Sequence, residues 1–135
     1  MLALGLLVGM LSQESCIVKA GYGTDEARIG ITKQSGVELI PDGITPLYES
    51  GYVSELYING PPCQTDKGIN VGDQSAKVIK AYGAGKKGQK RIKKGDLVIG
   101  QFGDYVLSYP GIEFAIYKDI VRVIIVEAVS ADSHR

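Results

Sequence analysis

The chain has 135 residues, 15 basic groups, 15 acidic groups and 18 glycines. This length admits one compact domain or two small units that share a core, and it excludes two independent large domains. A net charge of zero disfavours long-range attraction to nucleic acid or to an anionic membrane, and eight tyrosines without a tryptophan argue against an all-helical protein.

The chain opens with an apolar run over residues 1–11. No basic residue precedes this run, and it is too short to cross a bilayer, so an export signal is disfavoured and no membrane span is expected. We interpret the run as the start of a first structural unit, followed by a helix over residues 12–20. Ser12 is the predicted N-cap of that helix and Gly23 its predicted end.

A second stretch of sequence repeats the first. Residues 68–83 share with residues 5–23 a glycine-flanked valine and then a predicted short helix, here over residues 74–82, that ends in tyrosine and glycine. Three further segments correspond, namely 28–37 with 97–106, 44–48 with 112–117, and 53–58 with 121–126. The sequence therefore predicts an α+β protein of two tandem copies, residues 1–60 and 61–135. Each copy has one helix packed on one face of about four antiparallel strands.

Large apolar and aromatic side chains alternate with smaller or polar ones over residues 105–109 and 112–116, which is typical of strands with one buried face. Pro110 and Gly111 lie between them and predict a hairpin turn. Residues 121–126 are more continuously apolar, which indicates burial on both faces or at the junction between the copies.

The copies differ most at a basic insertion loop over residues 84–96. It carries six cations, which are the candidate partner-binding residues Lys86, Lys87, Lys90, Arg91, Lys93 and Lys94. A solvated hairpin is the default interpretation. Engagement of an acidic protein surface, an acidic polymer or a small anion is the functional alternative. Nucleic acid is disfavoured, because no aromatic residue lies among the lysines to stack on bases.

Three tyrosines, Tyr105, Tyr109 and Tyr117, are further candidates for contact with a partner, since a large ring with a polar tip suits an interface. Packing within half-buried strands is the competing explanation for all three. Asp25 and Glu26 are adjacent in a predicted turn, where solvated carboxylates are the default.

No catalytic residues, bound cofactor or metal site are predicted. The one histidine, His134, lies in a polar tail, so a histidine-dependent triad and a site with several histidines have little support. Two cysteines, Cys16 and Cys63, lack the spacing of a zinc site. They form either a disulfide or two buried thiols, and spacing alone leaves both alternatives open.

The phrase that runs from Thr65 to Gly83, together with Tyr109-Pro-Gly-Ile-Glu-Phe114, resembles a repeat of small bacterial secreted and envelope proteins. The tandem unit resembles the beta-lactamase-inhibitor-protein fold, and a single copy resembles the small lipoprotein of outer-membrane protein assembly. This resemblance implies an extracytoplasmic, non-enzymatic binding module, expected to inhibit a protein partner by surface occlusion. The alternative is a small-ligand or polyanion-binding domain that uses the sheet face or the lysine-rich loop.

Overall fold

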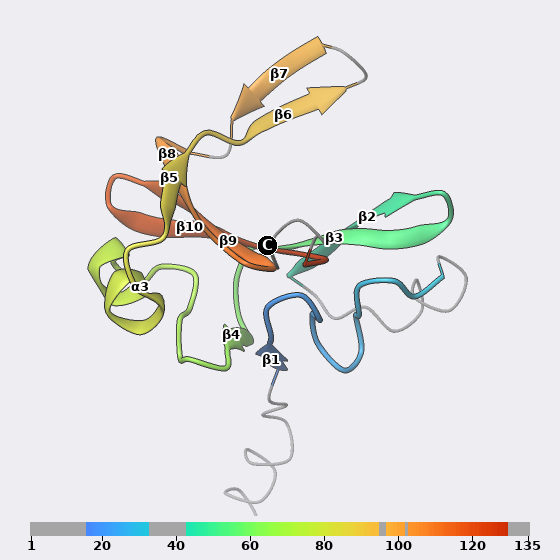
Figure 1. Ribbon diagram of the computed structural model, residues 1–135, viewed down its shortest axis with the longest axis horizontal. Helices are drawn as coiled ribbons and strands as arrows, with labels where there is room; N and C mark the ends of the chain where they lie inside the picture. The colour runs from blue at the N-terminus through green and yellow to red at the C-terminus, as the bar shows by residue number, and fades with distance from the viewer. Residues whose placement is uncertain (1–15, 33–42, 95–96, 102, 130–135) are drawn as a thin grey trace, which may run out of the picture.

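The computed structural model describes residues 16–32, 43–94, 97–101 and 103–129. Over these residues the protein is mostly β-structure, with ten strands and one helix (Figure 1). The prediction of two helices, each packed on its own sheet, is therefore wrong. The physical reason lies in residues 16–18, which form a strand where the first helix was expected.

The centre of the molecule is a six-stranded antiparallel sheet in the order β2-β3-β10-β9-β8-β5. In chain order its strands are β2 (Ile44–Glu49), β3 (Tyr52–Ile58), β5 (Lys86–Gly88), β8 (Tyr105–Tyr109), β9 (Ile112–Tyr117) and β10 (Ile120–Glu127). Strands from both sides of residue 60 join in this sheet, because β3 pairs with β10. The division into units 1–60 and 61–135 stays a prediction.

Short turns connect most neighbouring strands of the sheet. Pro110 and Gly111 join β8 to β9, as predicted, and Lys118 and Asp119 join β9 to β10. Both residues of the second turn have positive φ angles, which gives the backbone the twist that two-residue hairpins favour. Strand β10 lies between β3 and β9, and its neighbouring residues Ile124 and Ile125 are both fully buried. This agrees with the prediction of burial on both faces.

The sheet has two different faces. One face, which we call the core face, packs against the described helix and the first described strand, and Phe114, Leu56 and Ile124 are fully buried there. The other, which we call the outer face, carries a smaller cluster of Val106, Ala115, Val123 and Ile125, with Tyr57 packed beside it. The alternation of side chains along each strand separates the two clusters.

Helix α3 (Ser75–Tyr82) covers one end of the core face (Figure 1). It lies where the second helix was predicted, and Gly83 follows its last residue with a φ of 94°. Val78 is its buried residue, while the Tyr82 ring packs in a tilted arrangement against Tyr109 and Phe114, with centroid distances of 5.2 and 5.1 Å. The aromatic contacts, the buried Val78 and the hydrogen bond from the Ser75 amide to the Asp119 carbonyl therefore attach the helix to the sheet.

Strand β1 (Cys16–Val18) lies within the first predicted helix and pairs in parallel with β4 (Cys63–Thr65), and the two residues after it, 19 and 20, are not helical either. A disulfide joins Cys16 to Cys63, which lie directly opposite each other in this pair. Burial alternates along β1, with residues 16 and 18 buried and Ile17 exposed, as strand geometry requires. Residues 12–15 of the predicted helix lie outside the described residues.

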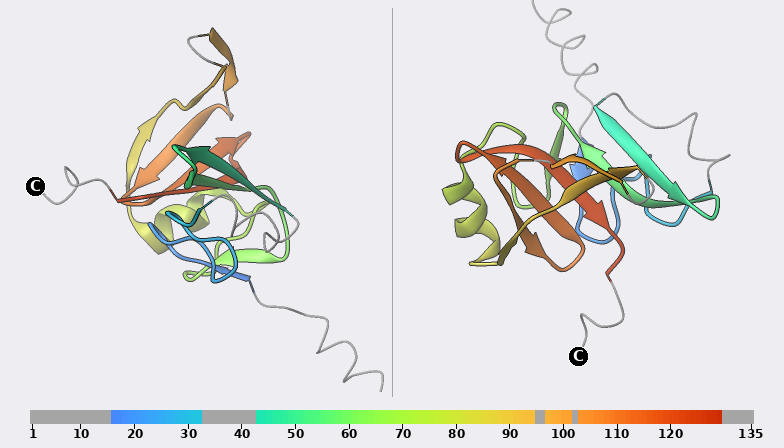
Figure 2. Two further views of the ribbon diagram at one scale, coloured as in Figure 1. Left: turned by 90° about the vertical axis from the view of Figure 1, so that its right-hand side faces the viewer. Right: turned by 90° about the horizontal axis from the view of Figure 1, so that it is seen from above.

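Part of the predicted basic loop is also strand. Strand β6 (Arg91–Lys94) pairs with β7 (Leu97–Gln101), and we call this two-stranded unit the ribbon. The ribbon rises on the outer-face side of the sheet, whereas β1 and β4 lie on the opposite side (Figures 1 and 2). In the part of the chain that the structure describes, no helix is both long enough and apolar enough to cross a membrane.

Candidate functional site

The six predicted cations lie in three different parts of the fold. Lys86 and Lys87 lie on β5 and are exposed, and Lys90 follows β5 and is mostly buried. Arg91, Lys93 and Lys94 belong to β6 of the ribbon. The segment therefore divides into an exposed edge, an internal ion pair and a projecting basic strand.

Lys90 is the centre of an ion cluster on the outer face. Its Nζ lies 2.8 Å from Glu55 Oε2, 3.1 Å from Glu113 Oε1 and 3.9 Å from Glu127 Oε2. The Tyr57 hydroxyl donates to Glu55 Oε1, and Ser108 Oγ donates to Glu113 Oε2 at 2.9 Å. We call these residues the Lys90 cluster. It links the base of the ribbon to the outer face.

The register of the sheet explains why three carboxylates meet there. Glu55 on β3 directly opposes Glu127 on β10, and Glu113 on β9 directly opposes Ser108 on β8. Like charges opposite each other destabilise a sheet. Lys90 therefore compensates a repulsion that the register itself creates.

The pKa values of the cluster reflect this arrangement. Burial raises the pKa of Glu127, and the neighbouring Glu113 raises it further against the opposing effect of Lys90. Burial alone would raise the pKa of Glu55, but the hydrogen bonds from Lys90 and Tyr57 outweigh it and lower that pKa. Burial would lower the pKa of Lys90, but Glu55 and Glu113 outweigh this and raise it. Lys90 therefore stays protonated at neutral pH.

The exposed cations of β5 interact with the sheet edge. Lys87 Nζ lies over the Tyr105 ring, 4.1 Å from its centroid. Tyr105 itself is half-buried and packs against the main hydrophobic core. Of these two candidate partner-binding residues, Lys87 lies on the surface, and Tyr105 mainly packs beneath it.

Tyr109 and Tyr117 have different surroundings. Tyr109 packs between Tyr82 and Phe114, and its hydroxyl donates to the carbonyl of Gly83 at 2.8 Å. Tyr117 is 41% exposed, with Lys118 and Arg122 over its ring at 5.3 and 5.1 Å. Tyr117 is therefore the predicted tyrosine most available to a partner, and Tyr109 holds the helix.

The carboxylates of the Lys90 cluster were not predicted from the sequence. Glu55, Glu113 and Glu127 are far apart in the chain, and only the strand register brings them together. No spacing rule could have identified them. Lys118 and Arg122 were also not predicted, although both lie near Tyr117 around a hairpin turn, and this proximity in the sequence could have indicated them.

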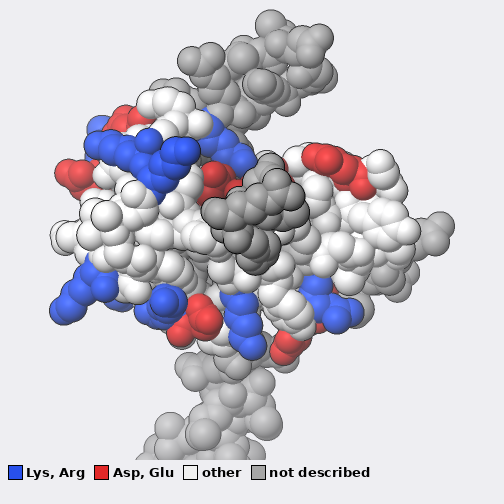
Figure 3. Space-filling view, viewed as in Figure 1, with Lys and Arg blue, Asp and Glu red and all other residues white. Residues whose placement is uncertain are grey.

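The charged side chains of the described residues are dispersed. No group of three or more His, Cys, Asp or Glu side chains among them could hold a metal ion. Over the described residues visible in Figure 3, Lys and Arg alternate with Asp and Glu, so no field of a single sign covers this face. His134 lies outside the described residues.

Comparison of the chain with known protein families, with characterised proteins and with solved structures gives no match.

Proposed function

We propose that this chain is a non-catalytic binding module of the bacterial cell envelope or of secreted material. In this proposal it docks the ribbon on a protein partner and acts by covering part of the partner's surface. The observation that carries the proposal is the ribbon, which stands away from the sheet and, within the described residues, pairs with no third strand (Figure 1).

A two-stranded ribbon is marginally stable alone in water, and its unpaired edges invite contact with other chains. Strand β6 has three cations among its four residues, Arg91, Lys93 and Lys94. Lysines on a strand that lacks a neighbour on one side disfavour pairing between copies of the same chain. They also favour a partner with an acidic surface, because charge complementarity raises the association rate and the specificity.

The Lys90 cluster supports the same proposal. Lys90 directly precedes β6, and its ion pairs reach two strands of the central sheet within 3.1 Å. Such an anchor holds the base of the ribbon in one position. Pre-organisation of this kind reduces the entropy that a binding element loses when it docks.

The proposed compartment rests on the disulfide. Disulfides persist in oxidising environments and are rare in the cytosol. Cys16–Cys63 joins β1 to β4, beneath the core face. Its presence supports an extracytoplasmic location, as does the resemblance to envelope proteins.

Charge reversal on the ribbon tests the proposal. The triple variant Arg91→Glu, Lys93→Glu, Lys94→Glu is compared with the control Lys67→Glu, Lys77→Glu, Lys80→Glu, which reverses the same number of charges near the helix. Proteins that the wild type captures from envelope extract are identified, and the affinity of each purified partner is measured. We expect the ribbon variant to lose at least about tenfold in affinity and the control to stay close to wild type. Equal losses in both variants would contradict docking through the ribbon.

Two further assays separate the competing functions. Thermal unfolding is followed with a sulfated polymer; stabilisation that disappears in the ribbon variant would assign the ribbon to a polyanion instead of a protein. Turnover of an ester, glycoside or peptide substrate that survives repurification would contradict the non-catalytic assignment.

A further inference from the structure

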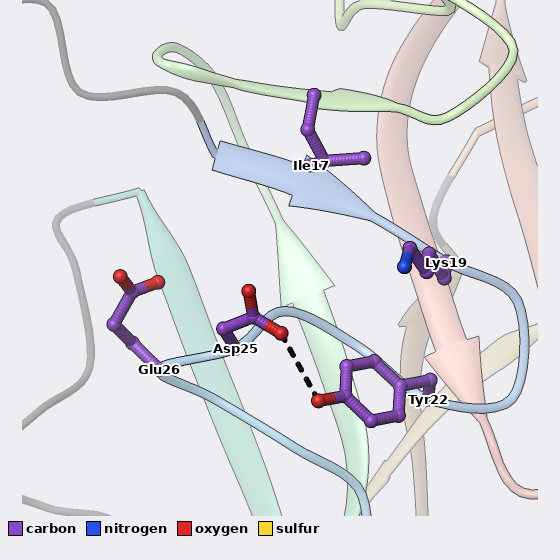
Figure 4. Close-up of a pocket in the computed structure, with 5 residues that line it drawn as sticks. All are labelled: Ile17, Lys19, Tyr22, Asp25 and Glu26. Carbon is purple, nitrogen blue, oxygen red and sulfur yellow. Dashed lines mark hydrogen bonds between the residues drawn. The ribbon is translucent and has the colours of Figure 1, made fainter.

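A small pocket lies at the start of the described chain, on the side of the molecule opposite the ribbon. It is lined by Ile17, Lys19, Tyr22, Asp25 and Glu26, and its volume is about 240 Å³. Figure 4 shows the two carboxylates on one side of the space and the Lys19 amine on the other, with Ile17 above and the Tyr22 ring below. The pocket therefore combines charges of both signs with two apolar walls.

The walls of the pocket are held in place by the fold. Ile17 follows Cys16, whose disulfide fixes β1 against β4. Gly23 pairs with Lys19 and with Arg28 in isolated bridges, so it closes the loop that carries the lining residues. A Cβ at Gly23 would lie 2.4 Å from the Ala27 carbonyl oxygen, and the φ of 100° also favours glycine.

The two carboxylates are held by a second closed turn. The Thr24 side chain is buried, and its Oγ1 accepts a hydrogen bond from the Ala27 amide at 2.9 Å. The Thr24 amide donates to the Ala27 carbonyl at 2.9 Å. Asp25 and Glu26 lie between these two residues. They are therefore presented on a hydrogen-bonded turn, and both are exposed, which agrees with the solvated turn predicted from the sequence.

The polar groups leave room for a ligand. Tyr22 donates its hydroxyl proton to Asp25 Oδ1 at 3.0 Å, so the other carboxylate oxygen of Asp25 can accept from a ligand. Lys19 Nζ lies over the Tyr22 ring at 5.9 Å. Among the described residues, no ion pair joins Lys19 to either carboxylate. Opposite charges are thus held apart across the pocket.

Two exposed apolar side chains also point to a ligand. Ile17 is 37% exposed and Tyr22 is 38% exposed, and both line this one pocket. An isolated exposed apolar residue needs no explanation, but two that meet in a concave site with polar groups are typical of a ligand pocket.

We infer that this pocket binds a basic amino acid, as a free molecule or as the carboxyl-terminal residue of a peptide. Its cationic side chain lies between Asp25 and Glu26 and against the Tyr22 ring, and its carboxylate meets Lys19. The site has a formal charge of −1, which matches the +1 charge of free arginine or lysine. The pocket is just below the range of about 300–1,000 Å³ for drug-sized ligands, so a single amino acid is the appropriate size.

Calorimetric titration with four compounds tests this assignment. Arginine carries all the groups, Nα-acetylarginine imitates a carboxyl-terminal residue, agmatine lacks the carboxylate, and glutamate lacks the basic side chain. We expect arginine to bind with a dissociation constant on the order of 1 mM, as suits a ligand of this size. Agmatine should bind about threefold more weakly, as expected for one lost exposed charge contact. Glutamate should not bind.

The acetylated compound distinguishes the two sources of the ligand. Affinity equal to that of arginine assigns the pocket to carboxyl-terminal residues as well, and weaker binding assigns it to the free amino acid. Agmatine that binds as tightly as arginine, glutamate that binds at all, or arginine that does not bind would each overturn the inference.

Variants of the lining residues locate the binding. Lys19→Gln should abolish the preference for arginine over agmatine, because it removes the partner of the carboxylate. Asp25→Asn with Glu26→Gln should weaken arginine binding about tenfold. The control is Lys67→Gln, since Lys67 also lies over a tyrosine ring, at 5.0 Å from Tyr82, but outside the pocket. An equal loss of arginine binding in the control would overturn the assignment to this pocket.

Discussion

Replacement of Lys90 by methionine is the most direct test of how the outer face is held together. The change keeps most of the apolar stem and removes the charge that three carboxylates share. The side chains of Lys90, Glu55 and Glu113 are 21%, 16% and 15% exposed. The cluster is therefore neither fully buried nor a surface salt bridge.

The expected loss follows from these exposures. Removal of one partner from a fully buried pair costs about 3–5 kcal/mol, whereas an exposed pair is worth about 0–1 kcal/mol. We expect Lys90→Met to lower the free energy of unfolding by about 2 kcal/mol, between these limits. Most of the loss comes from the three carboxylates, which keep their mutual repulsion without a cation.

Urea unfolding at neutral pH measures the loss, and Lys77→Met is the matched control. Lys77 pairs with Asp73 at 3.1 Å, the same distance as Lys90 to Glu113, but its side chain is 52% exposed. The control should change stability by less than about 0.5 kcal/mol. Adding Glu113→Gln to Lys90→Met should restore part of the loss, because it removes one of the repelling charges. Equal effects of the two lysine variants would refute the reasoning.

Hydrogen exchange tests the same prediction strand by strand. If the Lys90 cluster anchors the ribbon, Lys90→Met should accelerate amide exchange in β6 and β7 more than in β10. Uniform acceleration across all three strands would indicate a global loss of stability without a specific role at the ribbon.

Three other outcomes follow from the contacts. The pKa of Glu127 is raised from 4.5 in the folded state, so folding favours its protonated form, and stability rises as pH falls through the folded-state pKa. Glu127→Gln should therefore raise the urea midpoint at pH 7, and it should reduce the difference between the urea midpoints at pH 7 and pH 5. The double variant Cys16→Ala, Cys63→Ala removes the disulfide and should cost about 4 kcal/mol of stability, as the chain-entropy description gives for a sequence separation of 47. The loss is measured as a lower thermal midpoint, and adding a reductant should not lower the midpoint of this variant further. Tyr109→Phe should cost about 1 kcal/mol through the lost hydrogen bond, whereas Tyr117→Phe should be within about 0.5 kcal/mol of wild type; equal urea midpoints for the two variants would contradict this.

The parts of the fold that local sequence determines were predicted well. The turn at Pro110 and Gly111 and the helix ending before Gly83 both depend on a few neighbouring residues with strong backbone preferences. The burial of Ile124 and Ile125 on opposite faces was likewise visible as a continuous apolar run.

The parts that depend on distant segments were not predicted. Residues 16–18 form a strand because they pair with β4, which lies 47 positions further along the chain. The prediction of a helix there relied on an N-cap and on similarity to residues 74–82, and neither feature reports a long-range partner. The alternation of Cys16, Ile17 and Val18 is too short a pattern to distinguish strand from helix by itself.

The grouping of the six cations also depended on distant segments. Lys90 was grouped with five other cations because they are adjacent in sequence, yet its partners lie on β3, β9 and β10. In a strand, neighbouring residues point to opposite sides, so a run of charges along the chain need not form one surface. From a basic segment that folds into strands, the sequence therefore predicts which residues carry positive charge, but it does not predict that their side chains point to the same side.

The ribbon and the segment 17–26, which carries the residues that line the pocket, lie on opposite sides of the central sheet, with the main core between them (Figure 2). Changes at sites this far apart that share no partners are expected to add. Arginine binding in the Lys90→Met variant should therefore equal that of the wild type, and the ribbon charge reversals should leave it unchanged as well. A difference in either case would mean that the sheet itself has two arrangements that respond to both sites, since among the described residues the main core separates them. Such coupling would make ligand binding in the pocket a control on partner binding at the ribbon.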